Sequence, residues 1–174
     1  MNTNRLFFRN RTKELIDEML TYSKEEQMLF FGFSTKEQLT YKLKRIEEAL
    51  SKENVNYQIF DLVEKKNKIV IGSCGFHNWI KNHERSEIGY EIHKQYQNQG
   101  YMSEAIKKVI NYGFQEMNLN RIEALIDPMN ENSIRIVTKN GFKQEGILRG
   151  HYKNKNEFEN SIMYSLLKSD YDFN

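Results

Sequence analysis

The sequence predicts a mixed α/β domain, and two observations lead to this class. Segments whose apolar residues alternate, as in strands, are interspersed with segments whose apolar residues recur every three or four positions, as in helices. Turns between several neighbouring strand-like segments are only a few polar residues long, which favours antiparallel hairpins. With 174 residues, 39% of them hydrophobic, the chain can bury one core, so we expect a single domain over residues 1–174.

The first third of the chain predicts one strand and two helices. The second helix is expected to begin at Ser34, because Ser34 and Glu37 have the spacing of a capping box. Its run Lys42-Leu43-Lys44-Arg45 predicts a solvated face with only the leucine turned inward. The predicted elements are a strand at Arg5–Arg9, a helix at Lys13–Tyr22 and a helix from Ser34 to about Leu50, with Leu39, Leu43, Ile46 and Leu50 on its apolar face.

Strands dominate the middle of the chain, and the clearest helix follows them. Polar turns at residues 65–67 and 82–84 separate strands expected at Tyr57–Val63, Lys68–Phe76 and Ser86–Ile92. The helix has apolar residues or glycine at every core-facing position: Met102, Ala105, Ile106, Val109, Ile110, Gly113, Phe114 and Met117. After it we expect a strand at Arg121–Ile126, a short helix at about Ser133–Lys139, and strands at about Phe142–Leu148 and Phe158–Leu167.

The polar loop before the clearest helix suits a phosphate group. The first turn of a helix has unpaired N–H groups, and the helix dipole favours negative charge there. Gly100, the last residue of the loop, leaves the backbone open to close approach. An ordinary strand-to-helix turn has the same pattern, so the loop alone leaves both interpretations open. The sequence contains neither GxxxxGK[ST] nor GxGxxG, which excludes the two commonest nucleotide-binding loops.

Composition narrows the class of protein further. A net charge of +2 is too small to indicate nucleic-acid binding, and no apolar stretch is long enough to predict a membrane span. Residues 1–11 lack the apolar core of a signal peptide. Cys74, the single cysteine, lies in an apolar strand and is expected to be buried, and the four histidines lack metal-ligand spacing. We therefore expect a cytoplasmic protein without a metal.

Several short motifs follow one another along the chain. They are Ile88-Gly89-Tyr90, Gln97-x-x-Gly100-x-Met102, Asn130-x-x-Ser133, Lys139-Asn140-Gly141-Phe142, Glu145-Gly146 with Arg149, and Tyr164-Ser165-Leu166. In these motifs and their order, over about Arg5–Tyr171, the chain resembles the GNAT superfamily of acetyl-CoA-dependent N-acetyltransferases. Within it, the chain is most similar to the RimJ/RimL-like branch, which acetylates ribosomal-protein N-termini. Each motif is common alone, but the set in register is specific.

This resemblance implies a GNAT-type α/β (α+β) fold. In that fold a mixed, mostly antiparallel sheet splays at the cofactor and is flanked by helices. The resemblance also implies acetyl-CoA as cosubstrate, with the polar loop holding its pyrophosphate and the strand before the loop pairing with its pantetheine arm. The residues that it assigns to the cofactor are Tyr90, Ile92, Gln97, Asn98, Gln99, Gly100, Tyr101, Met102, Ser103 and Asn130.

The resemblance assigns Ser133 to the departing thiolate, but the sequence departs from the family elsewhere. Met102 stands where Gly or Ala is usual, and Val137 stands where many members have a general-acid Tyr. The glutamate that activates a water in related enzymes corresponds to Tyr152. Glu91 is the first candidate for deprotonating the amine through water, since the strand that should carry the thioester presents it, and Tyr152 is the second. A solvated carboxylate and a packed aromatic residue remain the alternatives.

The implied function is acetyl transfer to a primary amine, with the N-terminal amine of a ribosomal-type protein as the leading acceptor. A small amine acceptor (a polyamine, an amino acid or an aminoglycoside) is the alternative enzyme, and a catalytically idle CoA-binding module is the alternative from another class. Phe30, Phe31 and Phe33, in the loop expected between the first two helices, either line the acceptor site or form an ordinary hydrophobic loop. We expect no nucleic-acid or membrane partner, and a homodimer stays open.

Overall fold

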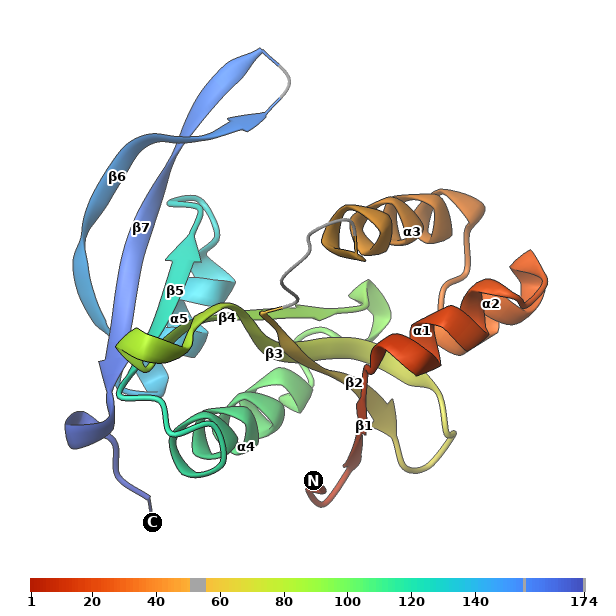
Figure 1. Cartoon of the computed structure of the whole chain (residues 1–174), viewed down its shortest axis with the longest axis horizontal. Helices are drawn as coiled ribbons and strands as arrows, with labels where there is room; N and C mark the ends of the chain where they lie inside the picture. Colours follow the sequence, from red (N-terminus) through yellow and green to blue (C-terminus); the bar gives the residue numbers. More distant parts are fainter. Residues whose placement is uncertain (51–55, 155, 174) are drawn as a thin grey trace. The chain divides into compact units, whose positions relative to one another are not determined.

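The computed structural model describes residues 1–50, 56–154 and 156–173, with only the backbone of residues 45 and 47–50. The strands of this part form a seven-stranded sheet in the order β1-β2-β3-β4-β5-β7-β6. β4 and β5 run parallel, whereas β1 with β2, β5 with β7 and β6 with β7 pair antiparallel. The predicted class, α/β with a mixed and mostly antiparallel sheet, is confirmed. Figure 1 labels the elements.

The chain divides into two compact units. The first unit consists of residues 1–75 and 90–105, and the second of residues 76–89 and 106–174. The first holds β1 (Leu6–Asn10), α1 (Lys13–Leu20), α2 (Lys24–Phe31), α3 (Lys36–Leu50) and β2 (Gln58–Glu64). The second holds β5 (Arg121–Ile126), α5 (Glu131–Lys139), β6 (Lys143–Asn154) and β7 (Glu157–Leu167). β3 (Val70–Ile80), β4 (Arg85–Ile92) and α4 (Tyr101–Gln115) each contribute residues to both units.

The three helices of the first unit share a hydrophobic cluster. Its buried residues are Ile16, Met19, Phe31, Leu39 and Ile46, and the half-buried Phe30, Phe33 and Leu43 pack against them. The side chain of Leu50, which the sequence places on the same apolar face of α3, lies outside the described residues. Because an eight-residue helix is marginal alone, α1 and α2 depend on this cluster for stability.

Helix α2 is a correction to the loop predicted between two helices. Ser23 accepts a hydrogen bond from the backbone N–H of Glu26, whose carboxylate accepts one from the backbone N–H of Ser23. Gly32 ends the helix in the left-handed conformation, with φ of 69°. Phe30 and Phe31 are therefore helical, and Phe31, only 1% exposed, lies in the cluster and cannot line an acceptor site.

The start of α3 is a second correction. The capping residue is Thr35, whose hydroxyl accepts from the Gln38 N–H at 3.3 Å. The Gln38 side chain accepts in return from the N–H groups of Ser34 and Thr35, both at 3.1 Å. The box therefore lies one residue later than the Ser34–Glu37 spacing indicates, because glutamine can fill the acidic position of the motif.

The second unit is built on the apolar face of α4, which confirms the predicted stripe. Ile106, Val109, Ile110 and Phe114 are all fully buried. Gly113 allows a close approach, since a Cβ there would lie 2.6 Å from the Phe76 ring. β5 has the predicted bounds, whereas β6 and β7 form a longer hairpin than expected, seen as the blue ribbon of Figure 1.

Parallel pairing between β4 and β5 is short. The register covers three pairs, from Arg85↔Arg121 to Glu87↔Glu123, and does not continue to Ile88 and Ala124 among the described residues. β5 stays paired with β7 over its whole length, from Arg121↔Leu167 to Ile126↔Ile162. β4 thus leaves its neighbour after Glu87, as the predicted splay requires.

The cap of α2 gives a direct stability test. Replacing Ser23 with Ala removes the acceptor for the Glu26 N–H, so the free energy of unfolding should fall by about 1 kcal/mol. The matched change Ser34→Ala removes a hydroxyl from an exposed residue and should stay within about 0.5 kcal/mol of the wild type. Urea unfolding measures both, and the opposite ranking would contradict the assignment of the caps.

Candidate active site

The loop between β4 and α4 has the features of an anion-binding turn. A 3-10 turn at Lys94–Tyr96 is followed by four exposed residues, Gln97, Asn98, Gln99 and Gly100. Asn98 and Gly100 both adopt positive φ, 59° and 79°, and asparagine and glycine are the residues that tolerate this conformation best. The glycine at position 100 is therefore required by the turn itself. A Cβ at Gly100 would have only Arg5 nearby, so this side of the loop is open.

Helix α4 begins with free donors beside this turn. Its first intrahelical bond runs from the Glu104 N–H to the Gly100 carbonyl at 3.1 Å. The N–H groups of Tyr101, Met102 and Ser103 precede that bond and have no acceptor within the helix. Together with the positive end of the helix dipole, these donors suit a phosphate.

Tyr101 and Met102 contribute to the loop through their backbones. Both side chains are buried, and the Tyr101 hydroxyl donates a hydrogen bond to Glu64. The long Met102 side chain, which replaces the usual Gly or Ala, packs inward and leaves the exposed side of the loop clear. Of these first three residues of α4, only Ser103 is exposed, so its hydroxyl remains accessible to a ligand.

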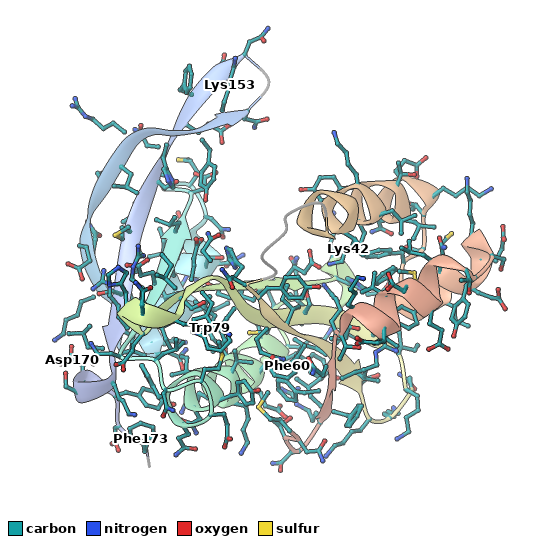
Figure 2. All side chains as sticks on the ribbon, in the orientation of Figure 1. Lys42, Phe60, Trp79, Lys153, Asp170 and Phe173 are labelled. Carbon is teal, nitrogen blue, oxygen red and sulfur yellow. The ribbon has the colours of Figure 1, made fainter. Side chains whose placement is uncertain are left out.

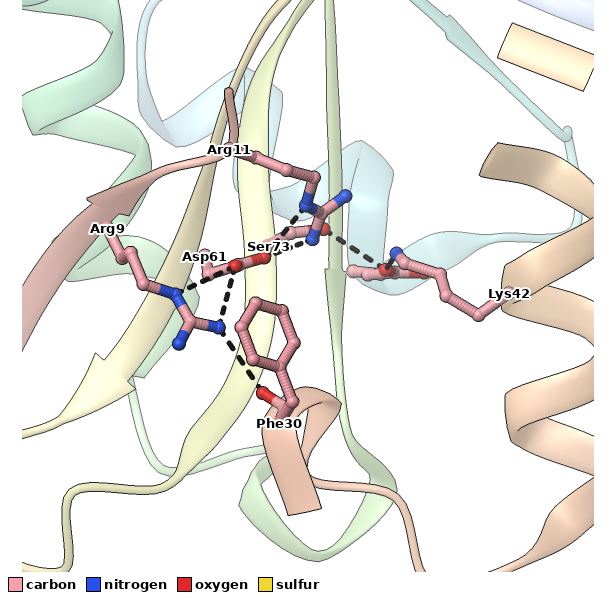
Figure 3. Close-up of polar contacts among 7 residues, drawn as sticks. Arg9, Arg11, Phe30, Lys42, Asp61 and Ser73 are labelled. Carbon is pink, nitrogen blue, oxygen red and sulfur yellow. Dashed lines mark hydrogen bonds and ion pairs between the residues drawn. The ribbon is translucent and has the colours of Figure 1, made fainter. Parts of the chain in front are cut away.

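Two carboxylates of the first unit lie in a charged cluster, which we define as Arg9, Arg11, Lys42, Asp61 and Glu91. Figure 3 labels its members other than Glu91. Asp61 of β2 is fully buried and accepts from both arginines, with Arg9 Nε at 3.1 Å and Arg11 Nε at 2.9 Å. Arg9 also donates to the Phe30 carbonyl of α2 at 3.3 Å. The cluster thus connects β1 and β2 to the helices of the first unit.

Glu91 forms an ion pair with Lys42 of α3 and accepts a hydrogen bond from the Ser73 hydroxyl of β3 at 3.1 Å. The Lys42 side chain is 9% exposed and that of Glu91 41% exposed. Figure 2 labels Lys42 on α3. The prediction of a solvated face at Lys42 is therefore wrong. The sequence around Lys42 holds no sign of its partner, because Glu91 lies 49 positions away.

The charged cluster governs the protonation of Glu91. Burial opposes ionisation, but the Lys42 charge and the hydrogen bonds from Lys42 and Ser73 outweigh it and lower the pKa of Glu91 to about 2. Burial and the Arg11 charge lower the pKa of Lys42, against the pull of Glu91. Glu91 is therefore a fixed negative charge near neutral pH, and a weak proton acceptor.

The remaining predicted residues belong to the second unit. The Asn130 side chain caps α5, accepting from the Ser133 N–H at 3.1 Å. Ser133 is half-buried in the first turn of this helix, and Val137 is fully buried. An Asn that caps its helix through the Ser three positions later explains the Asn130-x-x-Ser133 spacing in structural terms.

Tyr152 lies on the β6–β7 hairpin and is half exposed. Its ring centroid is 4.3 Å from that of His151. Burial and the negative charge of Glu87 raise the pKa of Tyr152, so its hydroxyl is protonated at neutral pH. Burial raises the pKa of Glu87, but the hydrogen bond and charge of His77 and the hydrogen bond from Asn78 lower it on balance. Tyr152 can therefore donate a proton more readily than accept one.

Two further side chains were judged from the sequence. Cys74 is fully buried in β3, and burial raises the pKa of its thiol, which confirms the prediction of a structural cysteine. His93, one of the four histidines without metal-ligand spacing, is half-buried against Phe33, and its Nδ1 has no hydrogen-bond partner among the described residues. Burial lowers the pKa of His93.

The candidate residues therefore fall into two groups. Tyr90, Glu91, Ile92 and the loop with the start of α4 belong to the first unit, and Asn130, Ser133 and Tyr152 to the second.

No group of three or more His, Cys, Asp and Glu side chains in the described residues could hold a metal ion. None of the helices described is both long and apolar enough to cross a membrane.

Comparison with known families gives a match over most of the chain. Residues 5–143 match the acetyltransferase (GNAT) domain. "Uncharacterized N-acetyltransferase YoaA" of Bacillus subtilis is 33% identical over 172 residues, which cover 97% of this chain and 96% of that protein. "Uncharacterized N-acetyltransferase p20" of Bacillus licheniformis is 41% identical over 112 residues, covering 64% of this chain and 63% of that protein.

A shorter match and a solved structure complete the comparison. Spermidine N(1)-acetyltransferase of Escherichia coli K12 is 32% identical over 89 residues, or 51% of this chain and 48% of that enzyme. The crystal structure of a GNAT-family acetyltransferase from Bacillus anthracis is 25% identical, with a TM-score of 0.69 over 97% of this chain and 98% of that one.

The pairing of Glu91 predicts how acid affects stability. Its pKa is about 2 in the folded chain and ordinarily near 4.5. The stability that ionised Glu91 contributes is complete above pH ~4.5 and is lost as the pH falls towards 2. Glu91→Gln should therefore destabilise the protein more at pH 7 than at pH 3, measured by urea unfolding at both values. The exposed Glu116→Gln should have little effect at either pH, and equal destabilisation by Glu91→Gln at both would refute the shift.

Proposed function

Because the chain belongs to the GNAT family of N-acetyltransferases, which use acetyl-CoA, we propose that it acetylates the N-terminal amine of a protein or peptide. N-acetyl transfer follows from the family. The choice of acceptor rests on the motif resemblance to the RimJ/RimL-like branch and on the charged cluster. The single domain over 1–174 and the cytoplasmic location remain part of the proposal.

The charged cluster is the observation that favours this acceptor. A polyamine carries several positive charges, and its recognition needs carboxylates that are free to pair with them. In the described part of the cluster, Asp61 is bound by two arginines and Glu91 by Lys42. An acceptor with one amine, which must become neutral before it reacts, does not require additional carboxylates.

The loop fits the pyrophosphate of acetyl-CoA. Gly100 leaves one side of the turn open, and the N–H groups of Tyr101, Met102 and Ser103 have no intrahelical acceptor. We assign Gln97, Asn98 and Gln99 to the same site, and the backbone of Tyr90 and Ile92 to the pantetheine arm. We assign Asn130 to the cofactor through the start of α5, which its side chain caps.

Bound acetyl-CoA supplies the acetyl thioester, and the chain supplies the groups that act on it. Backbone N–H groups of β4 that precede His93 stabilise negative charge that develops on the carbonyl oxygen, since the His93 N–H itself donates to the Ile71 carbonyl at 2.8 Å. The Ser133 hydroxyl donates a hydrogen bond to the thiolate that leaves, and the thiolate takes its proton from solvent or departs as the anion. Protonated Tyr152 suits the same donor role better than the role of base.

The sequence-based hypothesis that Glu91 acts as the base for the amine needs revision. Glu91, with a pKa of about 2, is too weak a base to accept a proton at neutral pH. We propose that it orders a chain of water molecules through which the amine passes its proton to bulk solvent, and that its negative charge stabilises the cationic water as the proton moves. Glu91→Gln should then lower kcat without moving the low-pH limb of the rate profile.

A small polyamine is the second candidate acceptor. It is favoured by the partial match to spermidine N(1)-acetyltransferase, which covers about half of each chain. The first helices also expose several acidic residues, among them Glu14, Asp17, Glu18 and Glu25. These carboxylates lie on the solvent side of their helices and could attract a polycation without holding it at the reacting centre.

The deciding experiment measures thiol release from acetyl-CoA. The acceptors are peptides with free N-termini, the same peptides with blocked N-termini and no lysine, and spermidine. We expect turnover with the free peptides and none with the blocked ones. A kcat/KM for spermidine above that for every free peptide would overturn the proposed acceptor, and no turnover with any amine would favour an idle CoA-binding module.

The roles of Ser133 and Asn130 can be tested separately, because the cap uses the backbone N–H of Ser133 and leaves its hydroxyl out. Ser133→Ala keeps the backbone N–H that Asn130 accepts from, and removes only the hydroxyl. It should lower kcat by about tenfold or more, with little change in the KM for acetyl-CoA. Asn130→Ala should instead cost about 1 kcal/mol of unfolding free energy through the lost cap. Steady-state kinetics with urea unfolding distinguish them, and an unchanged kcat in Ser133→Ala would remove Ser133 from the chemistry.

A further inference from the structure

Arg5, which directly precedes β1, contacts both sides of the turn that leads into α4. Its Nη1 donates to the Gln99 carbonyl at 2.9 Å. Its Nε donates to the Glu104 carboxylate at 2.7 Å, and its backbone N–H donates to the same carboxylate at 3.0 Å. The guanidinium carbon lies 4.2 Å above the centre of the Tyr101 ring. One side chain thus holds residues 99, 101 and 104, all within the first unit.

The bond to Gln99 fixes the peptide between Gln99 and Gly100. In a trans peptide the C=O and N–H point in opposite directions, so a carbonyl turned towards Arg5 turns the Gly100 N–H away from it. A peptide that precedes glycine can rotate readily, because glycine tolerates φ of either sign. Gly100 has φ of 79°, and Arg5 is the contact that holds this orientation. In the opposite orientation a carbonyl oxygen would occupy the place of an N–H donor.

Glu104 completes the arrangement. It lies in the first turn of α4, where its charge favours the helix but would repel a bound phosphate. Burial raises the pKa of Glu104, but hydrogen bonds from Thr3 and Arg5 and the Arg5 charge lower it on balance, so the carboxylate stays ionised. Arg5 compensates that charge and is itself oriented by it. Arg5 Nη2 lies 3.5 Å from where a Cβ of Gly100 would be, so the positive charge faces the open glycine.

We propose that Arg5 is a positioning residue for the phosphates of acetyl-CoA. It selects the peptide orientation that presents the Gly100 N–H on the side of the loop away from Arg5, and it compensates the charge of Glu104 in the first turn of α4. This inference rests on the proposed binding of acetyl-CoA at the loop. It assigns a role to a residue 94 positions before the turn, one that no loop motif includes. Lysine cannot replace it fully, because a single ammonium group cannot bind Gln99 and Glu104 with the fixed geometry of a guanidinium.

The test compares a donor that carries phosphates with one that does not. Calorimetry gives the Kd of CoA, and turnover of S-acetyl-N-acetylcysteamine reports on the thioester arm alone. Arg5→Gln should raise the Kd of CoA by about tenfold or more, since charge-assisted hydrogen bonds are lost. Turnover of the phosphate-free thioester should change by less than about twofold. Arg5→Lys should recover part of the affinity, and the exposed Lys66→Gln, which also removes one positive charge, should bind CoA as the wild type does.

The double variant Arg5→Gln/Glu104→Gln separates positioning from charge compensation. If Arg5 only cancelled Glu104, the double variant would regain wild-type affinity and the inference would fail. Weak CoA binding that persists in the double variant supports the role of Arg5 in fixing the peptide between Gln99 and Gly100. Equal losses for both donors, or unchanged CoA binding in Arg5→Gln, would also overturn it while leaving the proposed function intact. Absence of CoA binding by the wild type would remove the proposed function itself. Arg5→Lys serves as the reporter should Arg5→Gln fail to fold.

Discussion

The short parallel ladder between β4 and β5 is the constraint on which the proposed chemistry depends. After three residue pairs β4 leaves β5, while β5 remains paired with β7 along its whole length. Backbone groups that leave a ladder must be satisfied by other partners. A strand in this condition can accept an extended ligand along its free edge, which is how a pantetheine arm would bind. In the proposed binding mode, the loop that follows the same strand holds the phosphates at the other end of the cofactor.

The charged cluster of the first unit determines which strands and helices pack against one another. Asp61 is fully buried, and its two arginine partners come from β1 and from the residue just after that strand. Removing two charges from water costs about as much as their attraction returns, so such a cluster adds little net stability. It does fix which strand and helix meet, because any other packing would leave a charge unpaired. The orientation of Glu91 is thereby set by α3 and β3 and does not depend on a substrate.

Periodic features could be predicted from the sequence, and those that depend on distant partners could not. The stripe of α4 and the bounds of β5 follow from local patterns. Helix α2 was missed because it is short, exposes Leu29 and buries Gln27, although Ser23-x-x-Glu26 and Gly32 marked its two ends. Lys42 and Arg5 look like ordinary surface cations in the sequence. Their roles depend on Glu91 and on residues 99 and 104, which only the folded chain brings close.

The burial of Cys74 has a practical consequence. Its thiol is fully buried in β3, and burial raises its pKa, so the nucleophilic thiolate is scarce in the folded chain. Since this is the only cysteine of the protein, native samples contribute almost no background to colorimetric thiol detection. The same residue becomes a built-in probe of opening: the rate at which it is alkylated reports how often β3 separates from its neighbours, without any label being introduced.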